Sequence, residues 1–424
     1  MATAQLTDHG FMSGVGARHE SRTVRSKWPS RLIVYTPLLF ATVFAKFSPM
    51  AAVFPNIGLL FPMVLLALTI GLLTGRMRLV PTRLALYLLM LSVLVLVQVL
   101  RGDKFSFGSL AMMAALGLAY VPAVHDDAVT TEDAINFFCN LSFVIALAGV
   151  LQFAMQFVVG LEYAYPVEHF VPEAFRVHGY NSIAPLSYGS HIYKATAFIM
   201  LEPSVFCQLC ALGLTVELAT RSRAWRLLGY SAGIVVSYSG TGLLILAFTL
   251  PMLVVIHGRW DLLLRGLLLL AVLALLAEPL HLTVTLNRAG EFSSSGSSAF
   301  ARFVGWTELF ADKIWTSPVR AMFGYGSGSF VDAAAGYRAG EMAHAKIIFE
   351  FGILGALLYF AFIFHCLLRT RAPIVVRAAI VVAYFMNGAY SPTVTGLAAS
   401  LLLWPSPYPR TNKAQPNAEV SHER

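Results

Sequence analysis

Long apolar runs separated by short polar breaks follow one another along most of the chain. A helix needs about 20 mostly apolar residues to cross the roughly 30 Å hydrocarbon core of a membrane. Apolar runs lie near residues 32–49, 53–74, 84–100, 106–123, 134–160, 197–219, 227–239, 242–257, 266–282, 343–367, 374–390 and 393–405. The pattern predicts an all-α, polytopic integral membrane protein with about 12 transmembrane helices, within a range of about 10 to 12.

The polar segments between these runs set the domain organisation. We expect an N-terminal tail over 1–31, a single multispan membrane domain over 32–405 and a C-terminal tail over 406–424. Two longer polar loops, near 161–196 and 283–342, interrupt the membrane domain. No polar gap exceeds about 60 residues, which is too short for a separate soluble catalytic domain of ordinary size. A Rossmann-type module for nucleotide sugars is thereby excluded.

One apolar run of about 30 residues, from Leu227 to Ile256, is too long for one upright helix and short for two. Small, polar and flexible residues interrupt it at Ser237-Tyr238-Ser239-Gly240-Thr241-Gly242. Such residues mark turns. We therefore expect the chain to turn back at one membrane face within this segment.

Positive charges are distributed unevenly between the two sides of this topology. With the N-terminus in the cytoplasm, 19 of the 30 Lys and Arg residues fall in cytoplasmic segments. This arrangement obeys the positive-inside rule. Both termini are then cytoplasmic, and both long loops face the periplasm or the cell exterior.

Composition supports the membrane interpretation, and the placement of the charges argues against nucleic-acid binding. Of the 424 residues, 57% are hydrophobic and only 12% are charged, against about 25% charged in ordinary soluble domains. The net charge of +8 could suggest nucleic acid, but most of the basic residues lie where the orientation signal requires them. We expect membrane lipids as partners and no nucleic acid.

The cysteines give no sign of a metal site. Cys139, Cys207, Cys210 and Cys366 all lie inside apolar runs. Cys207 and Cys210 have CxxC spacing, but no second Cys or His pair accompanies them as zinc ligands would require. Neither long loop contains an Asp-x-Asp pattern. We expect no metal and no cofactor.

The second long loop carries most of the residues suited to chemistry. Arg302 and Arg320 offer planar cations that bind phosphate, and Trp306 and Tyr325 offer rings that stack on sugar faces. For any single cation, an ordinary solvated loop is the alternative. The glycine-rich segment 323–328 resembles a phosphate-binding loop only loosely, because it lacks the Walker lysine and Ser/Thr ending.

His344 opens the apolar run that follows this loop. It would sit at the N-terminal end of a helix, where the positive end of the helix dipole disfavours the imidazolium form. A neutral imidazole there could act as a general base. The alternative is an interfacial histidine whose hydrogen bonds are made with water.

Glu202 is the third candidate, at the edge of the run that follows the first long loop. A carboxylate inside a membrane span is costly and therefore usually has a partner or a task. The functional interpretation is a general base or a ligand of the acceptor sugar, and the alternative is an anion at a helix start. Before it, Arg176, Lys194 and Tyr188 belong to a mixture of cations and tyrosines typical of a sugar-contacting surface.

Taken in order, these motifs resemble the O-antigen ligase and polymerase superfamily, the Wzy-type polymerases and their relatives. The resemblance spans roughly residues 195–370. It rests on Glu202-Pro203-Ser204, the small-residue turn 237–242, Arg302 four residues before Trp306, Phe323-Gly324-Tyr325-Gly326, and a histidine that opens a helix containing Glu350-Phe351-Gly352-Ile353-Leu354-Gly355.

The resemblance implies a lipid-dependent glycosyltransferase in the bacterial inner membrane. Such an enzyme uses polyprenyl-diphosphate-linked oligosaccharide at the periplasmic face, without nucleotide sugar. By position, Arg302 matches the loop arginine that binds the diphosphate, and His344 matches the histidine proposed as base or acceptor contact.

The chain departs from the family pattern at two places. Relatives often have Ser-Arg where this chain has Ser239-Gly240, and we expect Arg176, Lys194 or Arg320 to supply the missing cation. The usual His-Asn is His344-Ala345 here. The second departure weakens the parallel at the histidine.

The first function hypothesis is polymerisation of lipid-linked repeat units into exopolysaccharide, because the Glu-Pro-Ser element and the Ser-Tyr-Ser-Gly-Thr-Gly variant look like those of exopolysaccharide polymerases. The alternative within the superfamily is an O-antigen ligase that transfers glycan to a lipid A core. A multispan transporter or flippase would instead show inverted repeats and charges along a midplane path. The expected partners of a polymerase are a flippase and chain-length or export proteins.

Overall fold

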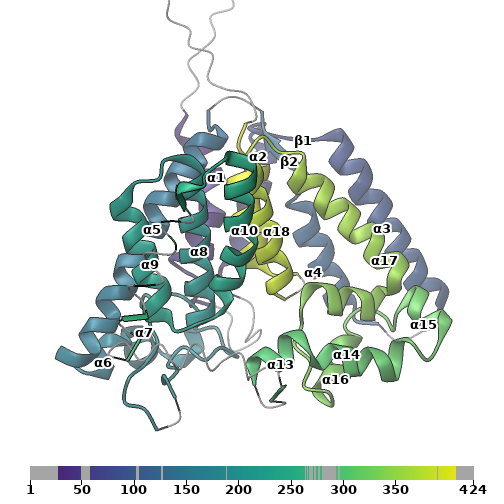
Figure 1. Cartoon of the computed structure of the whole chain (residues 1–424). Coiled ribbons are helices and arrows are strands. Elements are labelled where there is room, and N and C mark those ends of the chain that lie inside the picture. Colours follow the sequence, from purple (N-terminus) through teal and green to yellow (C-terminus); the bar gives the residue numbers. More distant parts are fainter. Residues whose placement is uncertain are drawn as a thin grey trace, which may run out of the picture.

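A computed structural model describes residues 27–48, 58–101, 105–125, 128–187, 189–262, 293–294, 297–388 and 390–406, with isolated positions between 264 and 278. The long helices lie side by side and run between the two ends of the molecule (Figure 1). The first half contributes α1 (Trp28–Thr42), α2 (Leu60–Leu73), α3 (Pro81–Arg101), α4 (Phe107–Leu118) and α5 (Thr131–Val158). The second half contributes α8 (Pro203–Thr220), α9 (Ala224–Ser237), α10 (Thr241–His257), α17 (Ala343–Leu368), α18 (Ile374–Met386) and α19 (Pro392–Ala398), the last continued by a π-helical turn, η4 (Ala399–Leu403).

The helices confirm the predicted all-α membrane fold in coarse form. Four of them, α3, α5, α8 and α17, are long and apolar enough to cross a membrane, and shorter apolar helices accompany them. Most of the predicted span near 266–282 lies outside the described residues. The total of about 12 spans therefore stays a prediction.

The span expected at 197–219 begins later than the hydropathy suggested. Ala197 and Phe198 have positive φ angles of 52° and 65°, which a helix does not accept. Helix α8 starts only at Pro203, where the fixed φ of proline suits the first helical position and its missing N–H costs nothing. The polar group of Glu202 therefore lies at a helix start.

Helix α8 packs between α5, α9 and α10 through small residues. A side chain at Gly149 would overlap the ring of Phe206, and one at Gly213 would overlap the ring of Tyr230. Small residues let membrane helices approach closely. This close packing fixes the direction of α8 and, with it, the position of the Glu202 end.

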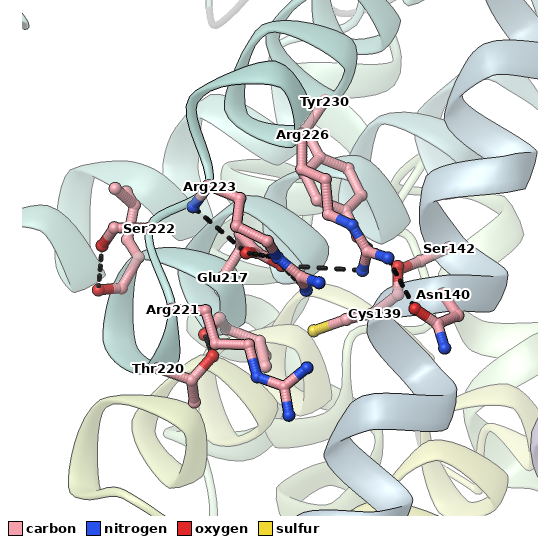
Figure 2. A network of polar contacts seen from close by, with 12 residues as sticks. Cys139, Asn140, Ser142, Glu217, Thr220, Arg221, Ser222, Arg223, Arg226 and Tyr230 are labelled. Atoms are coloured by element: carbon pink, nitrogen blue, oxygen red, sulfur yellow. Dashed lines mark hydrogen bonds and ion pairs between the residues drawn. The ribbon is translucent and has the colours of Figure 1, made fainter.

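An ion-pair network fixes the opposite end of α8 (Figure 2). Glu217 is fully buried and accepts three hydrogen bonds from Arg223, at 2.7 Å from Nε, 2.9 Å from Nη2 and 3.2 Å from the backbone N–H. Arg226 lies 3.7 Å from the same carboxylate and donates to Asn140 Oδ1 at 2.6 Å. Because Asn140 belongs to α5 and both arginines belong to the start of α9, the network joins three helices.

The two long loops fold into short helices at one end of the molecule, and the small β1–β2 sheet lies at the other end (Figure 1). The sheet pairs β1 (Met77–Leu79) with β2 (Pro122–Val124) in antiparallel register. The first loop forms α6 (Leu161–Ala164), α7 (Pro166–Phe170) and η1 (Glu173–Phe175). The second forms α13 (Ser298–Phe303), α14 (Gly305–Leu309), the π-turn η3 (Phe310–Ile314), α15 (Pro318–Phe323) and α16 (Ser329–Ala335).

Candidate functional site

Glu202 lies at the N-terminus of α8, where the loops meet the helices. Its backbone is extended, with φ −154° and ψ 164°, and Pro203 follows as the first helical residue. The hydroxyl group of Ser204 donates a hydrogen bond to the Glu202 carboxylate. The Glu-Pro-Ser element thus presents a carboxylate at the loop end of the molecule, held by its own neighbour.

The small-residue turn packs directly against this element. Helix α9 ends at Ser237, Tyr238 has a positive φ of 44°, and α10 begins at Thr241. Thr241 Oγ1 donates to the backbone oxygen of Ser204 at 2.9 Å. A side chain at Gly242 would come within 2.5 Å of the Cys207 carbonyl oxygen. The predicted turn is confirmed, and its small residues are needed because α10 approaches α8 so closely.

Arg302 reaches Glu202 from the second loop. It belongs to α13, which Ser297 caps by accepting a hydrogen bond from the Phe300 backbone N–H at 3.0 Å. Arg302 Nη2 donates to Glu202 Oε1 at 3.0 Å, with the arginine side chain 27% exposed and the glutamate side chain 21% exposed. Two residues predicted separately for the site therefore form one half-exposed ion pair.

Trp306 and His344 extend this group. Trp306 lies four residues after Arg302, on α14, and its ring meets the imidazole of His344 edge-on with centroids 5.0 Å apart. His344 is the second residue of α17 and is half-buried. Beside Arg302, the Gly340 backbone N–H donates to the Ala301 oxygen at 2.7 Å, which holds the start of α17 against α13.

The first loop reaches the same place through Tyr180. Partial desolvation raises the pKa of Tyr180, which is 44% exposed, and the negative charges of Glu202 and Glu341 raise it further. The phenol group therefore stays protonated and available as a donor. Next to it, Ser182 Oγ donates to the Leu201 backbone oxygen at 2.9 Å. Tyr180 is one of several tyrosines in the first long loop, and the structure places it close enough to Glu202 to feel its charge.

Arg320 and Tyr325 lie in a separate part of the second loop. The Arg320 guanidinium sits 4.5 Å from the Tyr325 ring centroid, and the Phe349 ring stacks on Tyr325 at 4.8 Å. Both neighbours lie against the Tyr325 ring. The predicted sugar-stacking role of Tyr325 stays a prediction.

The glycine-rich segment near Tyr325 packs against a break in α17. Gly352 interrupts the helix with φ 68° and ψ −173°, and Gly324 also has a positive φ of 72°. A side chain at Gly352 would overlap the Met322 backbone, and one at Gly324 would come within 2.5 Å of the Glu350 backbone. The Gly326 N–H donates to the Glu350 backbone oxygen at 2.9 Å. The two glycine motifs are therefore reciprocal packing elements, which accounts for their joint occurrence.

The remaining predicted residues lie in the first loop. Lys194 is buried, and its backbone oxygen accepts a hydrogen bond from Tyr165 Oη at 2.7 Å. Arg176 Nη1 donates to the Glu168 backbone oxygen at 3.1 Å, and Arg176 lines a pocket. Tyr188 lies outside the described residues. No described contact joins Arg176 or Lys194 to Arg302, so their predicted role as diphosphate ligands stays a prediction.

Sequence reasoning missed a buried pair beside this pocket. Lys46, after α1, forms an ion pair with Glu168, and their side chains are only 4% and 8% exposed. The two residues are 122 positions apart, and neither belongs to a recognisable motif. Their only signal in the sequence was a charge at the edge of an apolar run.

Metal ligands do not gather anywhere in the part of the chain that the structure describes. It contains no group of three or more His, Cys, Asp or Glu side chains placed to hold a metal ion. The four cysteines are buried and unpaired with one another.

Comparison with known proteins gives a family match. The family model described as WcaD colanic acid polymerase matches residues 107–406. This range includes Glu202, Arg302, Trp306 and His344, as well as both glycine motifs. No curated protein and no solved structure matches the chain.

Proposed function

This chain belongs to the WcaD colanic acid polymerase family, and from that premise we propose that it polymerises polyprenyl-diphosphate-linked oligosaccharide repeat units into exopolysaccharide at the periplasmic face of the bacterial inner membrane. The family identifies a repeat-unit polymerase of exopolysaccharide synthesis. The lipid-linked donor, the membrane face and the residues that act are the proposal.

One observation carries the assignment of the active site. Glu202 and Arg302 are 100 positions apart, yet Arg302 Nη2 lies 3.0 Å from Glu202 Oε1. Trp306 and His344 join this pair at the loop end of α8 and α17. Three motifs from separate loops and helices thus converge on one polar surface next to apolar helices, where a lipid-linked substrate would be presented.

Arg302 is the group that would bind the donor diphosphate. In the transfer, an acceptor hydroxyl attacks the anomeric carbon of the donor, and the bond from that carbon to the diphosphate oxygen breaks. The electron pair leaves with the diphosphate, whose growing charge a preplaced guanidinium stabilises. Arginine suits this task because its planar fork binds phosphate oxygens in bidentate fashion.

His344 and Glu202 are the candidates to accept the proton of the attacking hydroxyl. His344 stands at a helix N-terminus, where the dipole favours the neutral imidazole that a base requires. Glu202 is engaged by Arg302 and Ser204. When the donor phosphate draws Arg302 away, the carboxylate becomes free to accept a hydrogen bond from the acceptor. We assign proton acceptance to His344 and acceptor orientation to Glu202.

The experiment is deletion of the gene and complementation with wild type, Arg302→Ala, His344→Ala and Glu202→Gln, with polymer length as readout. We expect each substitution to lower polymerisation by about a hundredfold, the usual cost of removing a group that stabilises transition-state charge. Lys313→Ala, in the same loop and exposed on the π-turn, is the matched control and should restore wild-type chains.

The accumulated intermediate separates the two members of the superfamily. A polymerase defect leaves single repeat units on the lipid, whereas a ligase defect leaves long lipid-linked chains that are not transferred to lipid A core. In the proposed pathway a flippase supplies the lipid-linked unit, and chain-length or export proteins take the product. Wild-type polymer from all three site variants would refute the active-site assignment.

A further inference from the structure

The pocket lined by Arg176 lies beside the Glu202 end of α8. It has a volume of about 330 Å³ and is formed by the turn after α1, by α7 and by the loop that precedes Lys194. Lys46, Glu168, Arg176, Tyr180 and Asn181 are among its lining residues. A volume of this size falls at the lower end of the range of small-molecule sites, about 300–1,000 Å³.

The floor of the pocket is built from buried charges. Lys46 Nζ pairs with Glu168 and also donates to the Phe198 backbone oxygen at 2.9 Å and to Thr196 Oγ1 at 3.3 Å. These contacts hold the ammonium group in place. A buried lysine with this many partners has a fixed position, and the carboxylate paired with it is fixed as well.

Two polar atoms at this floor have no partner within the described residues. They are Glu168 Oε2, an acceptor on a side chain only 8% exposed, and Arg176 Nε, a donor. A buried polar atom left without a hydrogen bond costs about 1–3 kcal/mol. Both atoms belong to side chains that line the same pocket. A ligand that both donates and accepts hydrogen bonds would satisfy them once these side chains turn toward it.

The charge balance argues against a diphosphate here. Lys46 and Arg176 are offset by Glu168 and Glu173 on the same walls. Two carboxylates would repel a diphosphate, whereas a sugar hydroxyl can donate to a carboxylate and accept from a guanidinium at once. The amide of Asn181 and the phenol of Tyr180 add further donors and acceptors, as well as an aromatic ring.

We propose that this pocket binds a sugar ring of the acceptor saccharide and so selects the chain that is extended. The inference rests on the proposed function and deepens it by naming the acceptor site. Tyr180 and Leu201 line the pocket, and both stand next to Glu202, since Tyr180 feels its charge and Leu201 precedes it in the chain. A saccharide held here extends toward the Glu202–Arg302 pair, where its terminal hydroxyl meets the donor. Arg176 is then a saccharide ligand.

The test is saturation-transfer NMR on the purified full-length protein in nanodiscs, with the methyl glycosides of glucose, galactose and mannose as probes. Wild type should transfer magnetisation to at least one glycoside. Asn181→Ala and Glu168→Gln should each weaken that binding by about tenfold, the loss of one to two hydrogen bonds. Asn181→Ala leaves the Lys46–Glu168 pair intact and keeps the test valid if Glu168→Gln lowers stability.

His191→Ala, an exposed residue of the same loop that does not line the pocket, is the matched control and should keep wild-type transfer. Inorganic pyrophosphate at the same concentration should not displace the glycoside. Three results would each overturn the acceptor-pocket proposal. They are no magnetisation transfer to any glycoside, transfer that is unchanged in Asn181→Ala and Glu168→Gln, and displacement of the glycoside by pyrophosphate.

Failure of the pocket and failure of the proposed function give different results. If polymer synthesis depends on Arg302 but the pocket substitutions leave glycoside binding unchanged, only the acceptor-site proposal is wrong. If glycosides bind through the pocket but Arg302→Ala cells still make wild-type polymer, the active-site assignment is wrong and the pocket stands.

Discussion

Substitution of Gly352 by alanine tests whether the break in α17 positions the site. Gly352 has φ 68° and ψ −173°, a region that only glycine adopts readily and that costs other residues about 1–3 kcal/mol. The added methyl group would also overlap the Met322 backbone, and relief of such overpacking costs roughly another 1–3 kcal/mol. We expect a destabilisation of about 3 kcal/mol, a large part of the 5–15 kcal/mol typical of a folded domain.

The assay is thermal unfolding of the purified protein, followed by intrinsic fluorescence, together with polymer length in complemented cells. Gly352→Ala should lower Tm by several degrees and shorten the polymer, because the segment before the break carries His344. Gly336→Ala is the matched control: it lies in the second loop with an ordinary φ of −68°, and the nearest atom to an added side chain is 3.9 Å away. An unchanged Tm for Gly352→Ala would refute the reasoning that the break is enforced by packing.

Two further predictions concern the opposite end of the molecule and the membrane orientation. Glu217→Ala leaves the mostly buried Arg226 without its carboxylate and should lower the free energy of unfolding by about 3 kcal/mol. The control, Glu132→Gln, removes an exposed 3.9 Å ion pair and should change the free energy of unfolding by less than about 1 kcal/mol. Equal Tm shifts for both would contradict the role of the network. In intact spheroplasts, an impermeant thiol reagent should label Ser294→Cys and not Ala224→Cys, and the reverse labelling would overturn the periplasmic placement of the loops.

The sequence was most informative where one physical requirement dominates. Backbone groups in hydrocarbon must bond within their own segment, so long apolar runs predict helices, and α3, α5 and α17 lie close to their expected ranges. The start of α8 was placed too early because hydropathy does not register the turn at Ala197 and Phe198. Only backbone angles reveal that turn.

The candidate site was predictable in its members and less so in their grouping. Glu202 and His344 each stood out as a titratable residue at the edge of an apolar run, and Arg302 stood out as a cation of the second long loop. The structure brings Arg302 to Glu202 and places Trp306, four residues further on, against His344. Arg320 resembles Arg302 in sequence, yet it stacks on Tyr325 in another part of the loop. Which cation reaches Glu202 depends on how the second loop folds on itself, and no local pattern contains that information.

Pairings across long sequence distances escaped prediction altogether. Lys46 meets Glu168 only because the turn after α1 and helix α7 pack together. The mutual fit of Gly324 and Gly352 is likewise a property of two segments in contact. In both cases each residue has an ordinary local context, and its role arises from the partner.

We propose that Arg302, beside Glu202, promotes departure of a lipid diphosphate. The most direct measurement uses the lipid-linked repeat units that accumulate in the deletion strain, incubated with purified wild type or Arg302→Ala, while polymer length and free polyprenyl diphosphate are both followed. We expect wild type to release one polyprenyl diphosphate for each new linkage, and Arg302→Ala to do so at a rate about a hundredfold lower. Elongation by wild type without release of polyprenyl diphosphate, or an undiminished rate for Arg302→Ala, would contradict it.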